Sequence, residues 1–92
     1  MFGGPMNDAI QAKVTAILAS LLAVERVDLD DDFFMLGGDS LHATVLMVAL
    51  EKNYGVVIDP VEIFERPKVR EFVVWLEQVL AESVARSAGS RS

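Results

Sequence analysis

The sequence contains no cysteine, which excludes disulfide bonds and any thiolate chemistry supplied by the polypeptide itself. Positive charge is also scarce: 8 Lys and Arg residues stand against 14 Asp and Glu, for a formal net charge of −6. A nucleic-acid interface needs a basic stripe that displaces counterions from phosphates, so this composition disfavours nucleic acid as a partner. A protein partner with a basic surface suits the domain better.

Long apolar runs are missing as well. Charged residues interrupt every apolar segment well before it reaches the length that spans a bilayer, so we expect a soluble protein without membrane contact. Residues 1–5 have neither a basic stretch nor a long apolar core, so they do not form a secretory signal. We therefore expect a cytoplasmic protein, and 92 residues are enough for one small domain.

Apolar residues recur at steps of three and four, which predicts helices over residues 8–23, 40–53, 60–65 and 68–84. The first helix would begin at a capping box of Asp8 and Gln11, and the third at one formed by Asp59 and Glu62. The short apolar segment 56–58 has no partner strand, so we interpret it as a buried extended connector. The predicted fold class is all-α: a four-helix bundle with a long loop between helices I and II and a short helix III. We expect residues 1–7 to be a flexible N-terminus, 8–84 the folded domain, and 85–92 a disordered tail or linker.

The segment from Val24 to Asp39 is a loop of about sixteen residues, which is long for so small a domain. Its apolar residues should pin it to the core: Val27, Leu29, Phe33, Phe34 and Leu36. It is also strongly acidic, through Asp28, Asp30, Asp31, Asp32 and Asp39. Two interpretations remain open, a solvated charged loop or a surface that a basic enzyme recognises, and we favour the second because the loop ends at Ser40. The alternating aspartates faintly resemble a calcium loop, but Phe33 and Asp39 stand where such a loop needs Gly and Glu, so we expect no metal site.

The stretch from Phe33 to Leu41 organises the chain. Asp39 is a good N-cap, and Ser40 then takes the first helical position, where the positive end of the helix dipole best tolerates a phosphate ester. Gly37 and Gly38, just before the cap, would let a foreign enzyme approach the Ser40 hydroxyl closely.

The helix that follows Ser40 is apolar on two sides. One set of residues is expected in the core: Ala43, Leu46, Met47, Leu50 and Tyr54. Leu41, Val45 and Val48 form a second strip on another side, which suggests a docking surface. The alternative is that the later helices cover this strip.

These residues carry a family resemblance. The motif Leu36-Gly37-Gly38-Asp39-Ser40-Leu41, with Ala43, Leu46, Leu50, Tyr54 and Gly55 behind it, resembles the acyl or peptidyl carrier (thiolation) domains over residues 10–80. The resemblance implies that Ser40, within the motif residues Gly38, Asp39 and Leu41, carries a 4′-phosphopantetheine arm. A phosphopantetheinyl transferase would attach the arm from coenzyme A with Mg²⁺, and its thiol would hold acyl or aminoacyl groups as thioesters. The chain would then be a carrier and no enzyme itself.

The resemblance also implies partners, namely an adenylating or acyl-loading enzyme and condensing or tailoring enzymes. They would dock on Leu41, Val45 and Val48 and on the acidic residues Asp31, Asp32 and Asp39. The Gly37-Gly38 pair resembles the peptidyl carriers of nonribosomal peptide synthesis more than fatty-acid carriers, while a polyketide-type pathway stays open. Two residues depart from the family pattern: Lys68 stands where a capping Thr or Ser is usual, and Met35 where a polar residue is common.

Two other functions compete with a carrier. Gly38-Asp39-Ser40-Leu41 spells the signature of the GDSL esterases, which need a general base within reach of the serine. The only histidine, His42, follows two positions later, and on a helix this offset turns its side chain about 200° away from Ser40. A hydrolase is therefore disfavoured. The other alternative is a non-catalytic helical interaction domain in which Ser40 merely starts a helix.

Overall fold

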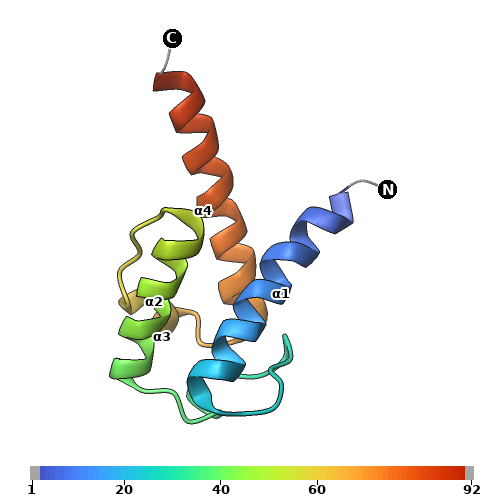
Figure 1. The fold of residues 1–92 in the computed structure, drawn as a ribbon, viewed down its shortest axis with the longest axis vertical. Coiled ribbons are helices and arrows are strands. Elements are labelled where there is room, and N and C mark those ends of the chain that lie inside the picture. Colours follow the sequence, from blue (N-terminus) through green and yellow to red (C-terminus); the bar gives the residue numbers. More distant parts are fainter. Residues whose placement is uncertain (1–2, 91–92) are drawn as a thin grey trace.

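The computed structural model describes the backbone of residues 3–90 and the side chains of residues 9–83. The described chain forms four α-helices: α1 (Gly3–Leu22), α2 (Ser40–Tyr54), α3 (Val61–Glu65) and α4 (Val69–Ser90). Helix α1 packs against α2 and α4, while the start of α1 and the end of α4 project beyond the other elements (Figure 1). The predicted all-α fold with one long loop and a short third helix is confirmed. Among the described helices, none is both long and apolar enough to cross a membrane.

The core draws apolar side chains from every helix and from the long loop. The largest fully buried side chains are Phe33, Phe72, Leu18, Leu46, Leu50, Ile63, Leu76, Val14 and Val69. Among the described side chains, no polar or charged residue is buried, so the core needs no hydrogen bonds between side chains. Trp75 lies at the edge of this core, and the Arg66 guanidinium covers its ring at 4.8 Å from the centroid.

Two helix ends differ from the prediction. Helix α1 begins at Gly3 instead of Asp8, because Pro5 falls in the first turn, where its missing N–H costs no hydrogen bond. Helix α4 ends at Ser90 instead of about residue 84; the added segment contains two Ala and one Arg, which favour a helix, and no proline that would stop it. The division into a domain over 8–84 with flexible ends stays a prediction, and residues 1–2 and 91–92 lie outside the described chain.

The long loop lies along the start of α4 and is hydrogen-bonded to it. The Phe33 N–H donates to the Pro67 carbonyl at 2.8 Å, and the Val69 N–H donates to the Asp31 carbonyl at 2.9 Å. The Arg70 N–H donates to the Leu29 carbonyl at 2.9 Å. Two loop carbonyls thus accept from the first N–H groups of α4, which otherwise lack partners. This backbone capping explains how α4 starts without the Thr or Ser that Lys68 replaces.

The connection from α2 through α3 follows the prediction with one correction. Val56 and Ile58 are buried and Val57 is 85% exposed, as in an extended connector, and no strand pairs with it in the described chain. Asp59 Oδ1 accepts from the Val61 N–H at 2.9 Å at the start of α3. Neither half of the predicted capping box forms: the Asp59 side chain accepts from the Val61 N–H and not from that of Glu62, and the Glu62 carboxylate pairs with Arg66 one turn later.

Candidate functional site

Ser40 is the first residue of α2, and its side chain is exposed at the end of the helix where the backbone N–H groups point outward. The helix behind it runs for 15 residues and is followed by Gly55, whose φ of 72° gives a left-handed C-cap. Ala43, Leu46, Met47 and Leu50 anchor this helix in the core. Ser40 is therefore presented to solvent by a firmly packed element.

Asp39 caps α2 as predicted. Its Oδ1 accepts from the His42 backbone N–H at 3.0 Å. This hydrogen bond is the main reason that the pKa of the Asp39 carboxyl lies below its usual value. Burial opposes this shift, and the nearby His42 side chain adds to it. The Asp39 carboxyl is therefore ionised at neutral pH, and the positive end of the helix dipole stabilises its negative charge.

His42 has a structural role that its place in the sequence did not indicate. Its Nδ1 accepts from the Asp39 backbone N–H at 3.3 Å, which closes a reciprocal capping box around the start of α2. The usual signal for such a box is Glu or Gln at this position, so the histidine did not lead us to predict a capping box from the sequence. His42 turns back onto Asp39.

The two glycines before the cap have structural reasons of their own. Gly37 has φ +98°, a region that other residues avoid. A Cβ on Gly38 would lie 2.5 Å from the Phe33 ring, which is fully buried and has little room to move. We predicted these glycines for the approach of an enzyme, whereas the structure requires Gly37 for its positive φ and Gly38 to make room for the Phe33 ring.

The two neighbouring aromatic residues have different environments. Phe33 is fully buried, whereas Phe34 is 44% exposed, so the predicted pinning of the loop holds for Phe33 more fully than for Phe34. Phe34 meets Phe33 edge-on and stacks on Phe64 of α3, both at 5.5 Å between ring centroids. The stack joins the loop to α3, a contact that sequence spacing did not indicate.

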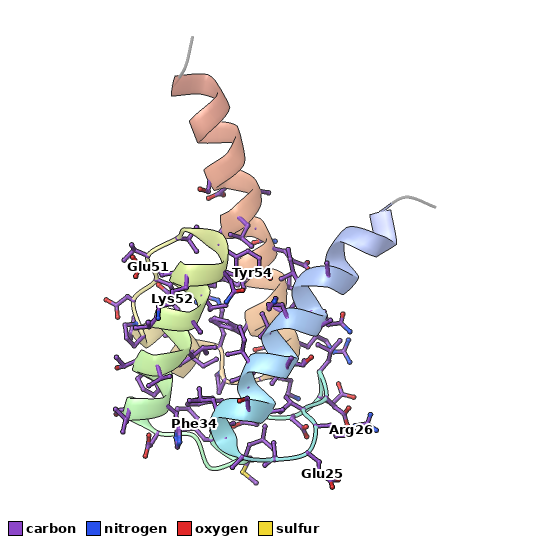
Figure 2. All side chains as sticks on the ribbon, in the orientation of Figure 1. Glu25, Arg26, Phe34, Glu51, Lys52 and Tyr54 are labelled. Carbon is purple, nitrogen blue, oxygen red and sulfur yellow. The ribbon has the colours of Figure 1, made fainter. Side chains whose placement is uncertain are left out.

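The second apolar strip of α2 is open to solvent. Leu41 is 71% exposed, Val45 45% and Val48 46%, so the alternative that later helices cover them is wrong. We call these three residues the α2 strip. In Figure 2, the charged residues Glu51 and Lys52 lie at the end of α2 remote from Phe34, which leaves the half near Ser40 without ionic side chains beyond Asp39 and His42.

The loop aspartates hold the loop together. Asp31 Oδ2 accepts from the Asp28 N–H at 2.8 Å, and Asp32 Oδ1 accepts from the Phe34 and Met35 N–H groups at 2.8 and 3.2 Å. Asp30 pairs with Arg70 at 2.7 Å, and the hydrogen bond from that guanidinium lowers the pKa of the Asp30 carboxyl. In the part of the chain that the structure describes, no three acidic or histidine side chains gather as metal ligands.

Comparison with known proteins agrees with this geometry. The family model described as "Phosphopantetheine attachment site" matches residues 12–76. The chondramide synthase of Chondromyces crocatus is 39% identical over 80 residues, which is 87% of this chain and 2% of that protein. Tyrocidine synthase 3 of Brevibacillus parabrevis is 34% identical over 77 residues, 84% of this chain and 1% of that protein. The chain thus spans only a small part of these relatives.

A solved structure shares the fold. BlmI, a type-II acyl carrier protein of Streptomyces verticillus involved in bleomycin biosynthesis, superposes with a TM-score of 0.78 at 24% identity. The superposition covers 83% of this chain and 92% of BlmI. At this identity the likeness concerns the arrangement of the helices alone.

Proposed function

Since this chain belongs to the phosphopantetheine attachment site family, we propose that the Ser40 hydroxyl oxygen is the atom that receives the 4′-phosphopantetheine group. A transferase would carry out the step: the Ser40 oxygen would give its proton to a base of the transferase and form a bond to phosphorus as the pyrophosphate bond of coenzyme A breaks and the nucleotide half leaves with its terminal phosphate. When bound, the group supplies a terminal thiol that the cysteine-free chain lacks.

The placement of Ser40 supports this assignment more than any other observation. Its exposed hydroxyl stands at the first position of a 15-residue helix, where outward N–H groups and the helix dipole favour a phosphate ester. The residues around it suit a long substituent, because Leu41 is exposed and Gly38 has no side chain. Asp39 is already committed to the His42 N–H and so holds the helix start in place.

The chain then acts as a carrier that holds acyl or aminoacyl groups as thioesters, and its relatives suggest a nonribosomal peptide pathway. Partner enzymes that load, condense or tailor the cargo dock on the α2 strip and on the acidic residues Asp31, Asp32 and Asp39. The exposure of the α2 strip beside Ser40 supports this docking surface. Its small apolar area suits weak and reversible binding.

Intact-mass measurement after incubation with coenzyme A, Mg²⁺ and a broad-specificity phosphopantetheinyl transferase tests the attachment. The wild type should gain the mass of one phosphopantetheine group, and Ser40→Ala should gain none. Ser20→Ala is the matched control, because Ser20 is an exposed serine on α1 and its loss should leave loading unchanged. An unchanged wild-type mass with a transferase that modifies a known carrier would favour a plain interaction domain instead.

The loaded domain distinguishes the pathways. The holo form would be incubated with adenylating enzymes and amino acids and, in a separate experiment, with acyl-loading enzymes. If the peptidyl assignment holds, a thioester should form in the experiment with amino acids. Loading by acyl groups alone would place the domain in a polyketide-type pathway.

A further inference from the structure

The turn over residues 33–39 is fixed by hydrogen bonds along its whole length. Every backbone N–H group in it donates to an acceptor within the described chain. Asp32 Oδ1 accepts from the Phe34 and Met35 N–H groups at 2.8 and 3.2 Å. The other acceptors are His42 Nδ1 and the carbonyls of Asp32, Phe33, Phe34 and Pro67. Because Phe33 is also fully buried, the turn is anchored in the core and its backbone is held in one conformation.

Met35 differs from the other apolar residues of this turn, because its side chain is 85% exposed. Phe34, the residue before it, is partly covered by its stack on Phe64. Met35 is not among the residues that pack against the core of the described chain. Its backbone N–H serves the turn, but any residue except proline supplies that donor. The fold therefore does not require an apolar side chain at this position.

Met35 and Leu41 lie on the two sides of Ser40 along the chain, and both are largely exposed. Met35 precedes Ser40 by five residues, so even a fully extended chain would place the two within about 18 Å, and the turn shortens this distance. A partner of ordinary size buries about 800 Å² on each side, which corresponds to a patch about 30 Å across. An enzyme that centres its active site on Ser40 therefore also reaches Met35.

The enzyme that must come this close is the transferase. It forms its bond at the Ser40 oxygen, so its active site has to enclose that atom. Enzymes that load or condense the cargo meet the thiol at the far end of the arm, so they can bind farther from Ser40. Residues 33–38 carry no charge, whereas Asp31, Asp32 and Asp39 border them. An apolar pocket with basic residues at its rim is the complementary surface.

We propose that Met35 is a binding anchor for the phosphopantetheinyl transferase, and that an apolar pocket of that enzyme takes up the thioether side chain. This inference rests on the proposed attachment at Ser40. The unbranched and polarizable thioether adapts well to irregular apolar pockets. Because the turn is already fixed in the free domain, little ordering is needed when the transferase binds. Met35 contacts the enzyme and not the reacting atoms, so it contributes to binding and not to the rate of the chemical step.

Three variants isolate the apolar contact. Met35→Gln keeps the length of the side chain and makes it polar, whereas Met35→Leu keeps it apolar. Val57→Gln is the matched control, because Val57 is also 85% exposed. Val57 follows the C-terminal end of α2, so about 20 Å of helix separates it from Ser40. All three variants should unfold at the wild-type urea midpoint. A lower midpoint for Met35→Gln alone would assign the side chain to the fold and overturn the proposal.

Loading would be measured by intact mass at a series of carrier concentrations, with one transferase, coenzyme A and Mg²⁺. Met35→Gln should raise KM about fivefold and leave kcat unchanged, since it removes binding that is equal in the ground state and the transition state. Met35→Leu and Val57→Gln should stay within about twofold of the wild type. A KM for Met35→Gln within about twofold of the wild type, or an equal rise for Val57→Gln, would overturn the proposal.

Methyl NMR tests the contact without any reaction. Ser40→Ala with labelled methionine methyl groups cannot accept the phosphopantetheine group, and Met35→Leu in the same background identifies the Met35 signal. That signal should shift or broaden when the transferase is added above the wild-type KM, and an unchanged signal would contradict the proposal. If the wild type is not loaded, the attachment at Ser40 and this inference both fail. If the wild type is loaded while Met35→Gln keeps its KM, only this inference fails.

Discussion

Helix α2 has two apolar faces, of which one is buried in the core and the other is exposed to solvent. Ala43, Leu46 and Leu50 are fully buried, while the α2 strip of Leu41, Val45 and Val48 remains in solvent. The side chains on the two faces are chemically alike, so hydrophobicity alone does not tell them apart. What separates them is how the other elements pack: α1 lies against α2, and the three residues of the strip remain at least 45% exposed. When the fold leaves some apolar residues of a helix unburied, those residues can form a binding surface for a partner.

The largest effect should come from a matched pair of leucines. Leu46→Ala removes a fully buried side chain and should lower the free energy of unfolding by about 2–5 kcal/mol. Leu41→Ala makes the same chemical change on the exposed face and should alter stability by less than about 0.5 kcal/mol. Urea unfolding followed by circular dichroism measures both. Equal losses would mean that the two faces do not differ as described.

The glycines before Asp39 should follow next in size. Gly38→Ala drives a Cβ into the Phe33 ring and should cost about 1–3 kcal/mol of unfolding free energy. Gly37→Ala, with no atom within 4 Å of its new Cβ, should cost about 1–2 kcal/mol through its positive φ alone.

Phe33→Leu as a second substitution distinguishes these two causes. It should reduce the cost of Gly38→Ala, because the smaller side chain makes room, and leave the cost of Gly37→Ala unchanged. Additive effects for Gly38→Ala and Phe33→Leu would argue against the steric explanation.

Substitutions in the α2 strip should weaken the binding of partner enzymes, although they should leave the stability of the fold almost unchanged. Leu41→Ala should raise the KM of the transferase or of a loading enzyme about tenfold, the loss expected for a central apolar contact. Val57→Ala is the matched control, because Val57 is exposed on the connector and lies outside the strip. Equal kinetics for Leu41→Ala and the wild type would remove the strip from the docking surface.

The smallest effect should be a pH dependence of stability from Asp39. Its pKa is lowered in the folded state, so its stabilising contribution is complete above the unfolded value of about 4. The contribution is lost as the pH falls through the lowered pKa. Comparing unfolding of the wild type and Asp39→Asn between about pH 2 and pH 6 should show a slightly larger acid loss in the wild type. Parallel curves would mean that the Asp39 cap does not depend on its charge.

The sequence predicted the parts that depend on local signals. Apolar spacing located the helices, Asp39 marked the start of α2, and Leu46 and Leu50 identified its core face. The exposure of the α2 strip could not be decided in advance, because it depends on where distant helices pack. Helix α1 also began earlier than its capping signal indicated, since Pro5 is compatible with a first turn.

Contacts between distant segments were beyond sequence reasoning. The stack of Phe34 on Phe64 and the capping of α4 by the Asp31 and Leu29 carbonyls join residues about thirty to forty positions apart. At the site, the role of Gly38 follows from the position of the Phe33 ring, which no local pattern encodes. The box closed by His42 was missed because histidine is not its usual partner.

Localising the modification within the loaded protein tests the central claim most directly. Thr44 carries an exposed hydroxyl one turn from Ser40, so peptide fragmentation by mass spectrometry must separate the two residues. We expect the phosphopantetheine mass on Ser40 alone, at one group per chain. Modification of Thr44 or of any other residue, with Ser40 unmodified, would contradict the assignment.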